Sequence, residues 1–193
     1  MKSLLAIALM LLPITSQATT ISGIFTMGID FGGKELVKGQ YIDGSTSTIH
    51  AGAGFSLTAG TIFVLPSKTV HTFEVQSTIG FKVTGLKSST NSSANWIRFP
   101  IDLLAFYHNI EQHFRLGGGI TYHIGNELTC SGKTNAQPKS YKNAIGKVFQ
   151  GDYFFGNEKI GLGMRYTMMN YLEKNDTRLV NGDSFGFQMT YLF

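Results

Sequence analysis

Hydrophobic and polar residues alternate with a period of two along most of the chain. The final segment shows this most clearly, because Phe185, Phe187, Met189, Tyr191 and Phe193 alternate with residues that are mostly small or polar. Alternation of this kind is typical of a β-strand whose two faces meet different surroundings. Glycine, threonine and β-branched residues interrupt every candidate helical pattern. The sequence therefore predicts an all-β protein.

The alternation predicts eight strands, at residues 21–31, 49–64, 70–85, 96–107, 114–124, 143–155, 159–172 and 184–193. Long polar connections (33–48, 86–95, 125–142 and 173–182) alternate with short ones (65–69, 108–113 and 156–158). Antiparallel strands with long loops on one rim and short turns on the other are typical of outer-membrane barrels. The predicted fold is a closed eight-stranded antiparallel transmembrane β-barrel, an up-and-down meander.

The two strand faces decide between a membrane barrel and a secreted soluble β-protein, which is the alternative. One face carries large aliphatic and aromatic side chains, and the other is small or polar. In a soluble barrel the apolar face would point inward. The polar face includes four acidic and four basic residues: Asp30, Glu74, Lys82, Arg98, Asp102, Arg115, Asp152 and Arg165. Because an eight-stranded barrel is just wide enough for side chains to fill it, we expect these residues to form a lumen charge network.

Aromatic residues support the same orientation. With the N-terminus on the periplasmic side, one rim would carry a girdle of Phe25, Phe63, Phe73, Tyr107, Phe114, Tyr153, Phe155, Tyr191 and Phe193. Lys147 fits this register worst, because it falls on the lipid-facing side of its strand. Either its side chain snorkels to lipopolysaccharide phosphates, or a bulge shifts the strand.

The N-terminal segment has the pattern of a secretory signal. Lys2 precedes an apolar run from Leu4 to Leu12, and small residues precede a cleavage site after Ala18. We therefore expect a signal peptide at 1–18 and a barrel domain at 19–193 located in the cell outer membrane. The apolar run is too short to span a bilayer as a helix, which needs about 20 residues.

Composition narrows the function classes. The chain has 193 residues, of which 15% are charged, 23 are glycine and one is cysteine. A single cysteine excludes an intrachain disulfide and a multi-cysteine zinc site. The net charge of +4 is mild and scattered, so no nucleic-acid partner is expected. No cofactor and no metal are predicted, and the protein is expected to be a monomer or nearly so.

The C-terminal segment from Phe185 to Phe193 resembles the terminal strand of Gram-negative outer-membrane proteins. In that family, a final phenylalanine with alternating upstream aromatics is read by the barrel-assembly machinery. The resemblance implies that Phe185, Phe187, Met189, Tyr191 and Phe193 form an assembly signal. The mature chain as a whole is similar to small barrels of the OmpA membrane-domain and OmpX kind.

Several residues carry chemistry that a barrel does not need. Histidines and a carboxylate at His108, Glu111 and His113 fall in one predicted turn, as a weak metal pattern or ordinary turn residues. His123 and Glu127 would be part of a lipid A hydrolase only if a serine such as Ser131 or Ser184 approached them. Cys130 is expected as a free thiol in the third long loop.

The expected function follows from the predicted barrel and from the weakness of the catalytic and metal-binding patterns. We expect a non-enzymatic barrel with a side-chain-filled lumen and a structural or adhesion-like surface role. The long loops hold many of the cations: Lys34, Lys38, Lys87, Lys133, Lys139, Lys142, Lys174 and Arg178. Outer-membrane lipid and lipopolysaccharide are the expected partners, because phosphates lie at the height of these loops. The alternatives are a lipid A-modifying enzyme and a narrow pore.

Overall fold

The computed structural model describes residues 20–40, 46–87, 93–109, 111–131, 137–156 and 158–193. The predicted signal peptide and the cleavage site after Ala18 lie outside these residues. Within the described part of the chain, no helix is long and apolar enough to cross a membrane.

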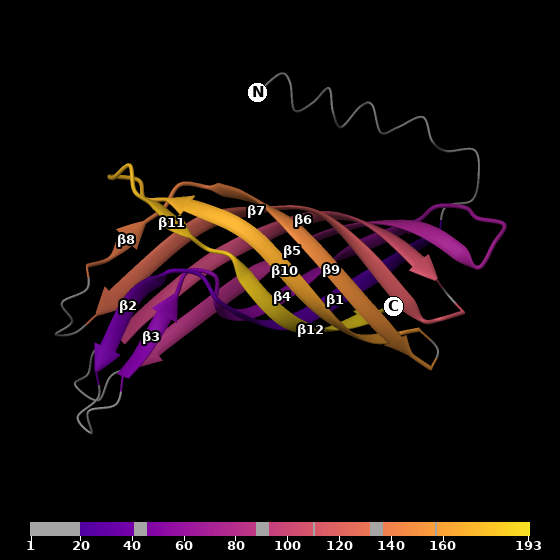
Figure 1. Ribbon diagram of the computed structural model, residues 1–193, viewed down its shortest axis with the longest axis horizontal. Helices are drawn as coiled ribbons and strands as arrows, with labels where there is room; N and C mark the ends of the chain where they lie inside the picture. The colour runs from indigo at the N-terminus through magenta and orange to yellow at the C-terminus, as the bar shows by residue number, and fades with distance from the viewer. Residues whose placement is uncertain (1–19, 41–45, 88–92, 110, 132–136, 157) are drawn as a thin grey trace, which may run out of the picture.

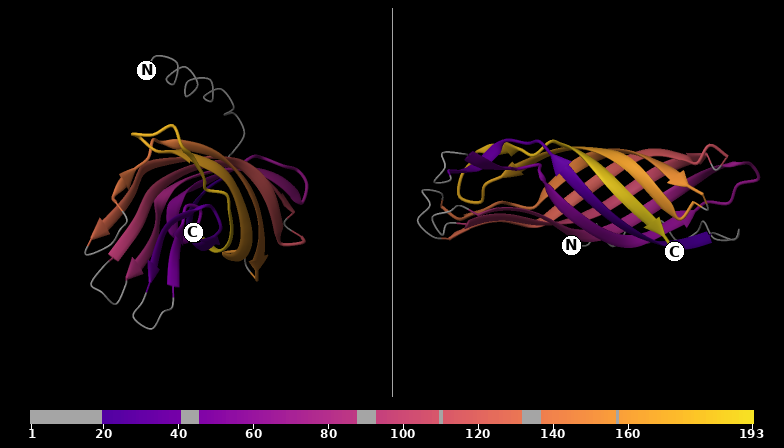
Figure 2. Two further views of the ribbon diagram at one scale, coloured as in Figure 1. Left: turned by 60° about the vertical axis from the view of Figure 1, so that its left-hand side comes forward. Right: turned by 90° about the horizontal axis from the view of Figure 1, so that it is seen from below.

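Eight strands close into a barrel (Figures 1 and 2). They are β1 (Thr20–Phe31), β4 (Gly54–Val64), β5 (His71–Lys87), β6 (Ser93–Asn109), β7 (Phe114–Ser131), β9 (Ala144–Phe155), β10 (Ile160–Leu172) and β12 (Ser184–Leu192). Each strand pairs antiparallel with the next, and β12 pairs with β1, from Phe31 opposite Phe185 to Ile24 opposite Leu192. This closure confirms the predicted fold class.

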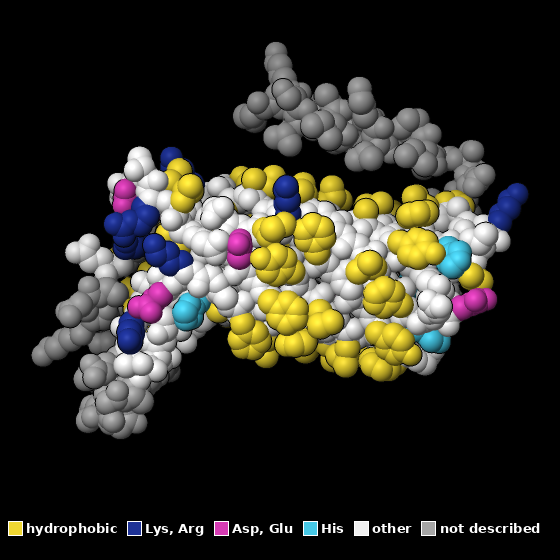
Figure 3. All heavy atoms as spheres, in the orientation of Figure 1, with side chains coloured by type: hydrophobic (Ala, Val, Ile, Leu, Met, Phe, Trp, Pro, Cys, Tyr) yellow, Lys and Arg dark blue, Asp and Glu magenta, His cyan; other side chains and the backbone are white. Residues whose placement is uncertain are grey.

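The outer wall is apolar and the inner wall is polar at the middle of the barrel. Phe187, Leu162 and Ile79 are among the large apolar side chains exposed on the outside. Figure 3 shows such side chains covering the middle of the barrel, whereas many of the charged groups in that view gather at the end with the long loops. Because every strand has two neighbours, the backbone is hydrogen-bonded without water, as a bilayer requires.

The aromatic residues of the predicted girdle meet across neighbouring strands at the end with the short turns. Phe25 lies opposite Tyr191, and Phe114 lies opposite Tyr153. The rings of Phe73 and Tyr107 pack edge to face with centroids 5.7 Å apart. The C-terminus lies at this same end (Figure 1).

The first long connection folds into a hairpin, and the predicted strand at 49–64 is wrong in its first part. The hairpin consists of β2 (Glu35–Gln40) and β3 (Thr46–His50). The predicted strand is interrupted between β3 and β4, where the chain changes direction. The break is held by backbone bonds, because Ala51 donates to the Lys34 carbonyl at 2.8 Å and Gly52 donates to the Gly32 carbonyl at 3.1 Å. Gly33, with a φ of 83°, lies so near Gly52 that a Cβ there would overlap its backbone nitrogen.

Three strands are longer than predicted. β5, β6 and β7 extend beyond the barrel, so much of the predicted loops at 86–95 and 125–142 is strand. The extension begins on the long-loop side of a bulge at Gly125, which we call the upper side. Gly125 has a φ of 61°, and the β6–β7 register shifts there. The inward side chains of the extension are apolar, which keeps the extended strands together in water. Two short strands lie at the same end: β8 (Lys139–Ser140) pairs with β7, and β11 (Leu179–Asn181) pairs with β10.

Candidate functional site: the filled lumen

The layer of the lumen nearest the short turns is built around Arg115 of β7. Its guanidinium donates to Asp152 Oδ2 from Nε at 3.0 Å and from Nη2 at 2.6 Å. It also donates from Nη1 to Glu74 Oε2 at 3.2 Å. The guanidinium carbon lies 4.0 Å from the Phe106 ring centroid and 5.2 Å from that of Phe154. A buried cation is therefore paired with two carboxylates and stacked between two rings.

Three further polar side chains contact the two carboxylates of this layer. Gln150 donates to Asp152 Oδ2 at 2.9 Å, and Gln188 donates to Asp152 Oδ1 at 2.8 Å. His108 Nδ1 lies 2.6 Å from Glu74 Oε1. These polar partners fill the carboxylate lone pairs that Arg115 leaves open, which a buried carboxylate requires.

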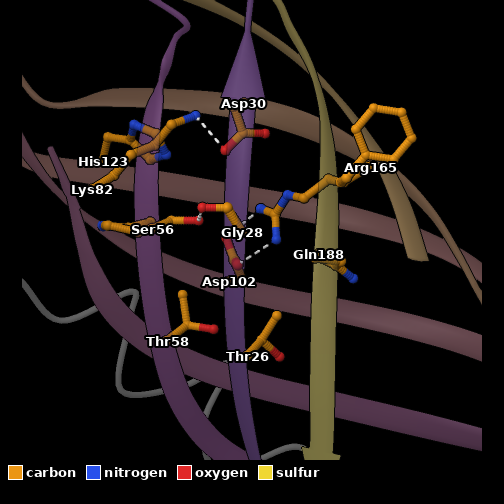
Figure 4. Close-up of a pocket in the computed structure, with 12 residues that line it drawn as sticks. Thr26, Gly28, Asp30, Ser56, Thr58, Lys82, Asp102, His123, Arg165 and Gln188 are labelled. Carbon is orange, nitrogen blue, oxygen red and sulfur yellow. Dashed lines mark hydrogen bonds and ion pairs between the residues drawn. The ribbon is translucent and has the colours of Figure 1, made fainter. Parts of the chain in front are cut away.

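The middle layer holds two further ion pairs (Figure 4). Lys82 Nζ lies 2.9 Å from Asp30 Oδ2. Arg165 holds Asp102 with two bonds, from Nη1 at 2.8 Å and from Nη2 at 2.9 Å. Figure 4 shows these pairs lining one small space. That cavity measures about 30 Å³, which is room for one or two water molecules.

An apolar cluster closes the lumen at the long-loop end. We call it the cap; it consists of Val37, Ile49, Ala51, Leu86, Ala94, Trp96, Leu128, Tyr141, Ala144, Met169, Tyr171 and Val180. The Trp96 ring packs edge to face on Tyr141 and Tyr171, with centroids 5.0 and 5.4 Å away. Arg98 is fully buried beneath it and donates from Nη1 to the Ala51 carbonyl at 2.6 Å. The first long loop is thereby fastened into the mouth of the barrel.

The structure places all eight predicted lumen charges inside the barrel, but not in one layer. Arg115 and Asp152 pair across neighbouring strands, whereas Arg165 binds Asp102 in the middle layer. Arg98 donates to the Ala51 and Ala53 carbonyls, and Asp102, four residues further along the same strand, is not one of its partners. Sequence reasoning missed Gln150, Gln188 and the inward aromatics of this lumen. Strand parity could have found the two glutamines, because Gln150 is two residues from Asp152 and Gln188 lies between the outward-facing Phe187 and Met189.

The predicted metal candidates do not come together. His108 belongs to β6 rather than to a turn, and it points into the lumen toward Glu74. His113 instead meets Glu158, with Nδ1 3.1 Å from Oε1. Among the described residues, no group of three His, Cys, Asp or Glu side chains is placed to hold a metal ion.

The candidate hydrolase residues are also separated. The bulge at Gly125 adds one residue to β7, so His123 is buried inside whereas Glu127 is exposed outside. His123 Nδ1 lies 2.7 Å from the Tyr171 hydroxyl instead. Ser131 is exposed and its hydroxyl lies 2.7 Å from that of Ser93. Ser184 is buried and its hydroxyl has no hydrogen-bond partner. The described residues therefore contain no hydrogen-bonded acid–histidine–serine arrangement.

The remaining predicted residues lie on strands. Cys130 is in β7 opposite Ala94, packed against the cap, and not in a loop. Its partial burial raises the pKa of its thiol. The β12 residues Phe185, Phe187, Met189 and Tyr191 expose their side chains on the outer wall, as does the final Phe193.

An apolar outer wall, a closed ring of eight tilted strands and a lumen filled by ion pairs define a small transmembrane β-barrel of the outer-membrane type. No protein-family model and no curated protein matches the sequence. Solved structures do. The attachment invasion locus protein Ail of Yersinia pestis, in complex with the heparin analogue sucrose octasulfate, has 12% identity and a TM-score of 0.48, over 91% of this chain and 97% of Ail. Neisserial surface protein A has 9% identity and a TM-score of 0.49, over 92% of this chain and all of that one.

Proposed function

We propose that this protein is a non-enzymatic surface protein of the outer membrane, in which a closed barrel holds a folded cationic platform outside the cell. The platform consists of the cap and the exposed lysines around it: Lys34, Lys38, Lys142 and Lys174. The observation that carries the proposal is the cap, because it fixes the first long loop and the ends of β5, β6 and β7 in one apolar cluster. A platform held rigidly pays less ordering entropy on binding than free loops do.

The charge of the platform indicates what it binds. Lys34, Lys38, Lys142 and Lys174 are exposed at this end, and none of them has an acidic partner among the described residues. Two other cations there are already paired, Lys139 with Glu173 at 3.0 Å and Arg178 with Asp176 at 3.8 Å. Unpaired exposed cations favour an anionic surface polymer, attracted most strongly at low salt.

Binding of dextran sulfate to the refolded protein in lipid nanodiscs tests this role, with neutral dextran as the blank. We expect binding that weakens as salt rises, and a loss of about tenfold or more when all four lysines become glutamine. The matched control replaces Lys68, which lies in the short turn between β4 and β5 at the opposite end. Unchanged binding by the fourfold variant would refute the surface role.

Two measurements address the alternatives. The small cavity and the buried layers on either side of it support a lumen that does not conduct, so a planar bilayer should stay silent. The separation of His123 from Glu127 supports the absence of hydrolysis, so lipid A mass spectra should not change on expression. Stepwise conductance or altered acylation would replace the proposal with a pore or an enzyme.

We also propose that the outer face of β12 is the assembly signal. Its apolar side chains alternate to the end of the chain, where Phe193 closes the barrel by accepting from the Gly23 amide at 2.7 Å and donating to the Gly23 carbonyl at 3.0 Å. Deleting Phe193 should lower the amount of folded protein in outer membranes. If the amount of folded protein in the membrane were unchanged, this assignment would be wrong.

A further inference from the structure

Lys147 is an outward-facing cation on β9. Its strand pairs with β7 and β10 in continuous register on both sides, so no bulge turns Lys147 inward. The side chain is exposed on a wall otherwise covered by apolar groups such as Ile145 and Phe149. Among the described residues it has no ion-pair or hydrogen-bond partner. An unpaired ammonium in such a wall is costly unless it reaches the interface or meets an anion.

The depth of Lys147 can be worked out from the pairing. Tyr122 marks the upper edge of the apolar wall, where its hydroxyl accepts from Asn143 Nδ2 at 3.0 Å. Tyr122 lies opposite Ile145, and Lys147 is two residues further along β9, opposite Ile120. Two residues of a tilted strand descend about 5 Å. The side chain of Lys147 is long enough to bring its ammonium back up to the headgroup level.

Two recesses in the outer wall flank Lys147. One, of about 520 Å³, lies toward β10 and is lined by Ile120, Ile145, Gly146, Lys147, Met168, Met169, Asn170 and Asp183. The other, of about 440 Å³, lies toward β7 over Gly118 and beside Leu116 and Phe149. Both are shallow and largely apolar, so each has the character of a furrow for an acyl chain. Lys147 stands between them.

From this geometry we propose that the wall around Lys147 is a binding site for lipid A, with one phosphate on the Lys147 ammonium and acyl chains in the recesses on either side. Lipid A carries several acyl chains on one phosphorylated disaccharide, so it can place chains in both furrows while one phosphate meets the cation between them. The leaflet agrees, because Lys147 lies near the long-loop end of its strand. Asn170 exposes a side-chain amide, unpartnered among the described residues, in the first recess. It can donate to the same phosphate or to a sugar hydroxyl.

Asp183 is the one carboxylate among the described residues that lines these recesses, and both of its oxygens already accept hydrogen bonds. Oδ1 accepts from the Met169 amide at 2.8 Å, and Oδ2 accepts from Asn181 Nδ2 at 2.9 Å. It therefore holds the β10 and β11 ends together and does not neutralise Lys147. A second copy of the chain is the competing occupant of this wall, because the Lys147 of that copy could pair with the Asp183 carboxylate of the first.

Native mass spectrometry of the refolded chain in detergent tests the proposal. The variants are Lys147→Gln and Lys147→Arg, with Lys68→Gln, in the exposed short turn between β4 and β5 at the opposite end, as the matched control. Removing a charge from a lipid-facing wall does not hinder insertion, and heat-dependent gel migration verifies folding. With bisphosphorylated hexa-acyl lipid A added, we expect one retained lipid in the wild type, in Lys147→Arg and in Lys68→Gln. Retention should fall at least about fivefold in Lys147→Gln.

Three results would overturn this assignment. Equal retention by Lys147→Gln would remove the role of the cation. Equal retention of dephosphorylated lipid A, or of phosphatidylglycerol, would show that the phosphate or the multiple chains are not recognised. A dimer that the Lys147→Gln change dissociates would assign the wall to a second copy. The inference rests on the proposed outer-membrane location but not on the polymer-binding platform, which is tested separately by dextran sulfate binding.

Discussion

Replacing Arg115 with methionine isolates the contribution of the buried ion pairs. Methionine keeps most of the side-chain volume between Phe106 and Phe154 but removes three charge-assisted bonds to Asp152 and Glu74. Such bonds contribute roughly 1.5–3 kcal/mol each, which sets an upper limit of about 9 kcal/mol.

The net effect is smaller than this limit, because both carboxylates keep other partners. Asp152 retains two glutamine amides, and Glu74 retains His108. Removing one partner of a buried pair typically costs about 3–5 kcal/mol, and we expect a loss of that size in the free energy of unfolding. Changing both carboxylates to amides in the same variant should recover most of it, since no buried charge then lacks a partner.

Urea titration in detergent micelles measures these differences through the single tryptophan of the chain, Trp96, which is buried in the cap. The matched control is Arg178→Met, an exposed loop residue whose replacement should change stability by less than about 0.5 kcal/mol. An unfolding free energy of Arg115→Met within about 1 kcal/mol of the wild type would show that these ion pairs do not stabilise the barrel. A loss that persists after the added amide changes would show that it does not come from unpaired buried charge.

Three further perturbations test other parts of the structure. Gly163→Ala should lower the unfolding free energy by about 1–3 kcal/mol, because its Cβ would overlap the Asp152 carboxylate, whereas Gly151→Ala, whose Cβ would lie 3.4 Å from its nearest neighbour, should be neutral. Alkylation of Cys130 should be slow at neutral pH and accelerate toward and above pH 9, since its pKa is raised and only the thiolate reacts; a rate equal to that of a free cysteine peptide at pH 7 would contradict this. Trp96→Ala should expose the β2–β3 hairpin to trypsin, and an uncut hairpin would mean that the cap does not hold the loop.

The barrel was predictable because the side chain at each strand position faces either lipid or the lumen, and these two faces alternate along the strand. In β12, every second side chain must face lipid, so alternation alone fixes the strand and its orientation. Pairing of the lumen charges was less predictable, because it depends on which strands become neighbours and on their stagger. Arg165 and Asp102 are 63 residues apart, and only barrel closure brings them together.

The bulge at Gly125 shows the limit of counting positions. His123 and Glu127 are four residues apart, which places them on one face of a regular strand. One extra residue at a glycine with positive φ moves Glu127 to the opposite face. Glycine is compatible with such a bulge but does not require it. The cap was missed for a related reason, since half of its residues come from the predicted loops and they meet the others only when the hairpin folds inward.

The same bulge marks where the surroundings of the barrel change. Below Gly125, β7 turns polar side chains such as Thr121 and His123 inward and apolar ones such as Tyr122 outward. Above it, Leu128 points inward and Glu127 outward, so the polarity of the two faces is reversed. A strand that leaves the bilayer must make this reversal. In lipid the apolar face is stable on the outside, whereas in water it is stable only when it is buried on the inside. The ion pairs of the lumen and the apolar cap are therefore two responses to one requirement, separated at the upper edge of the membrane. Lys147 lies just below that edge, at the level where an outward cation can still reach a phosphate.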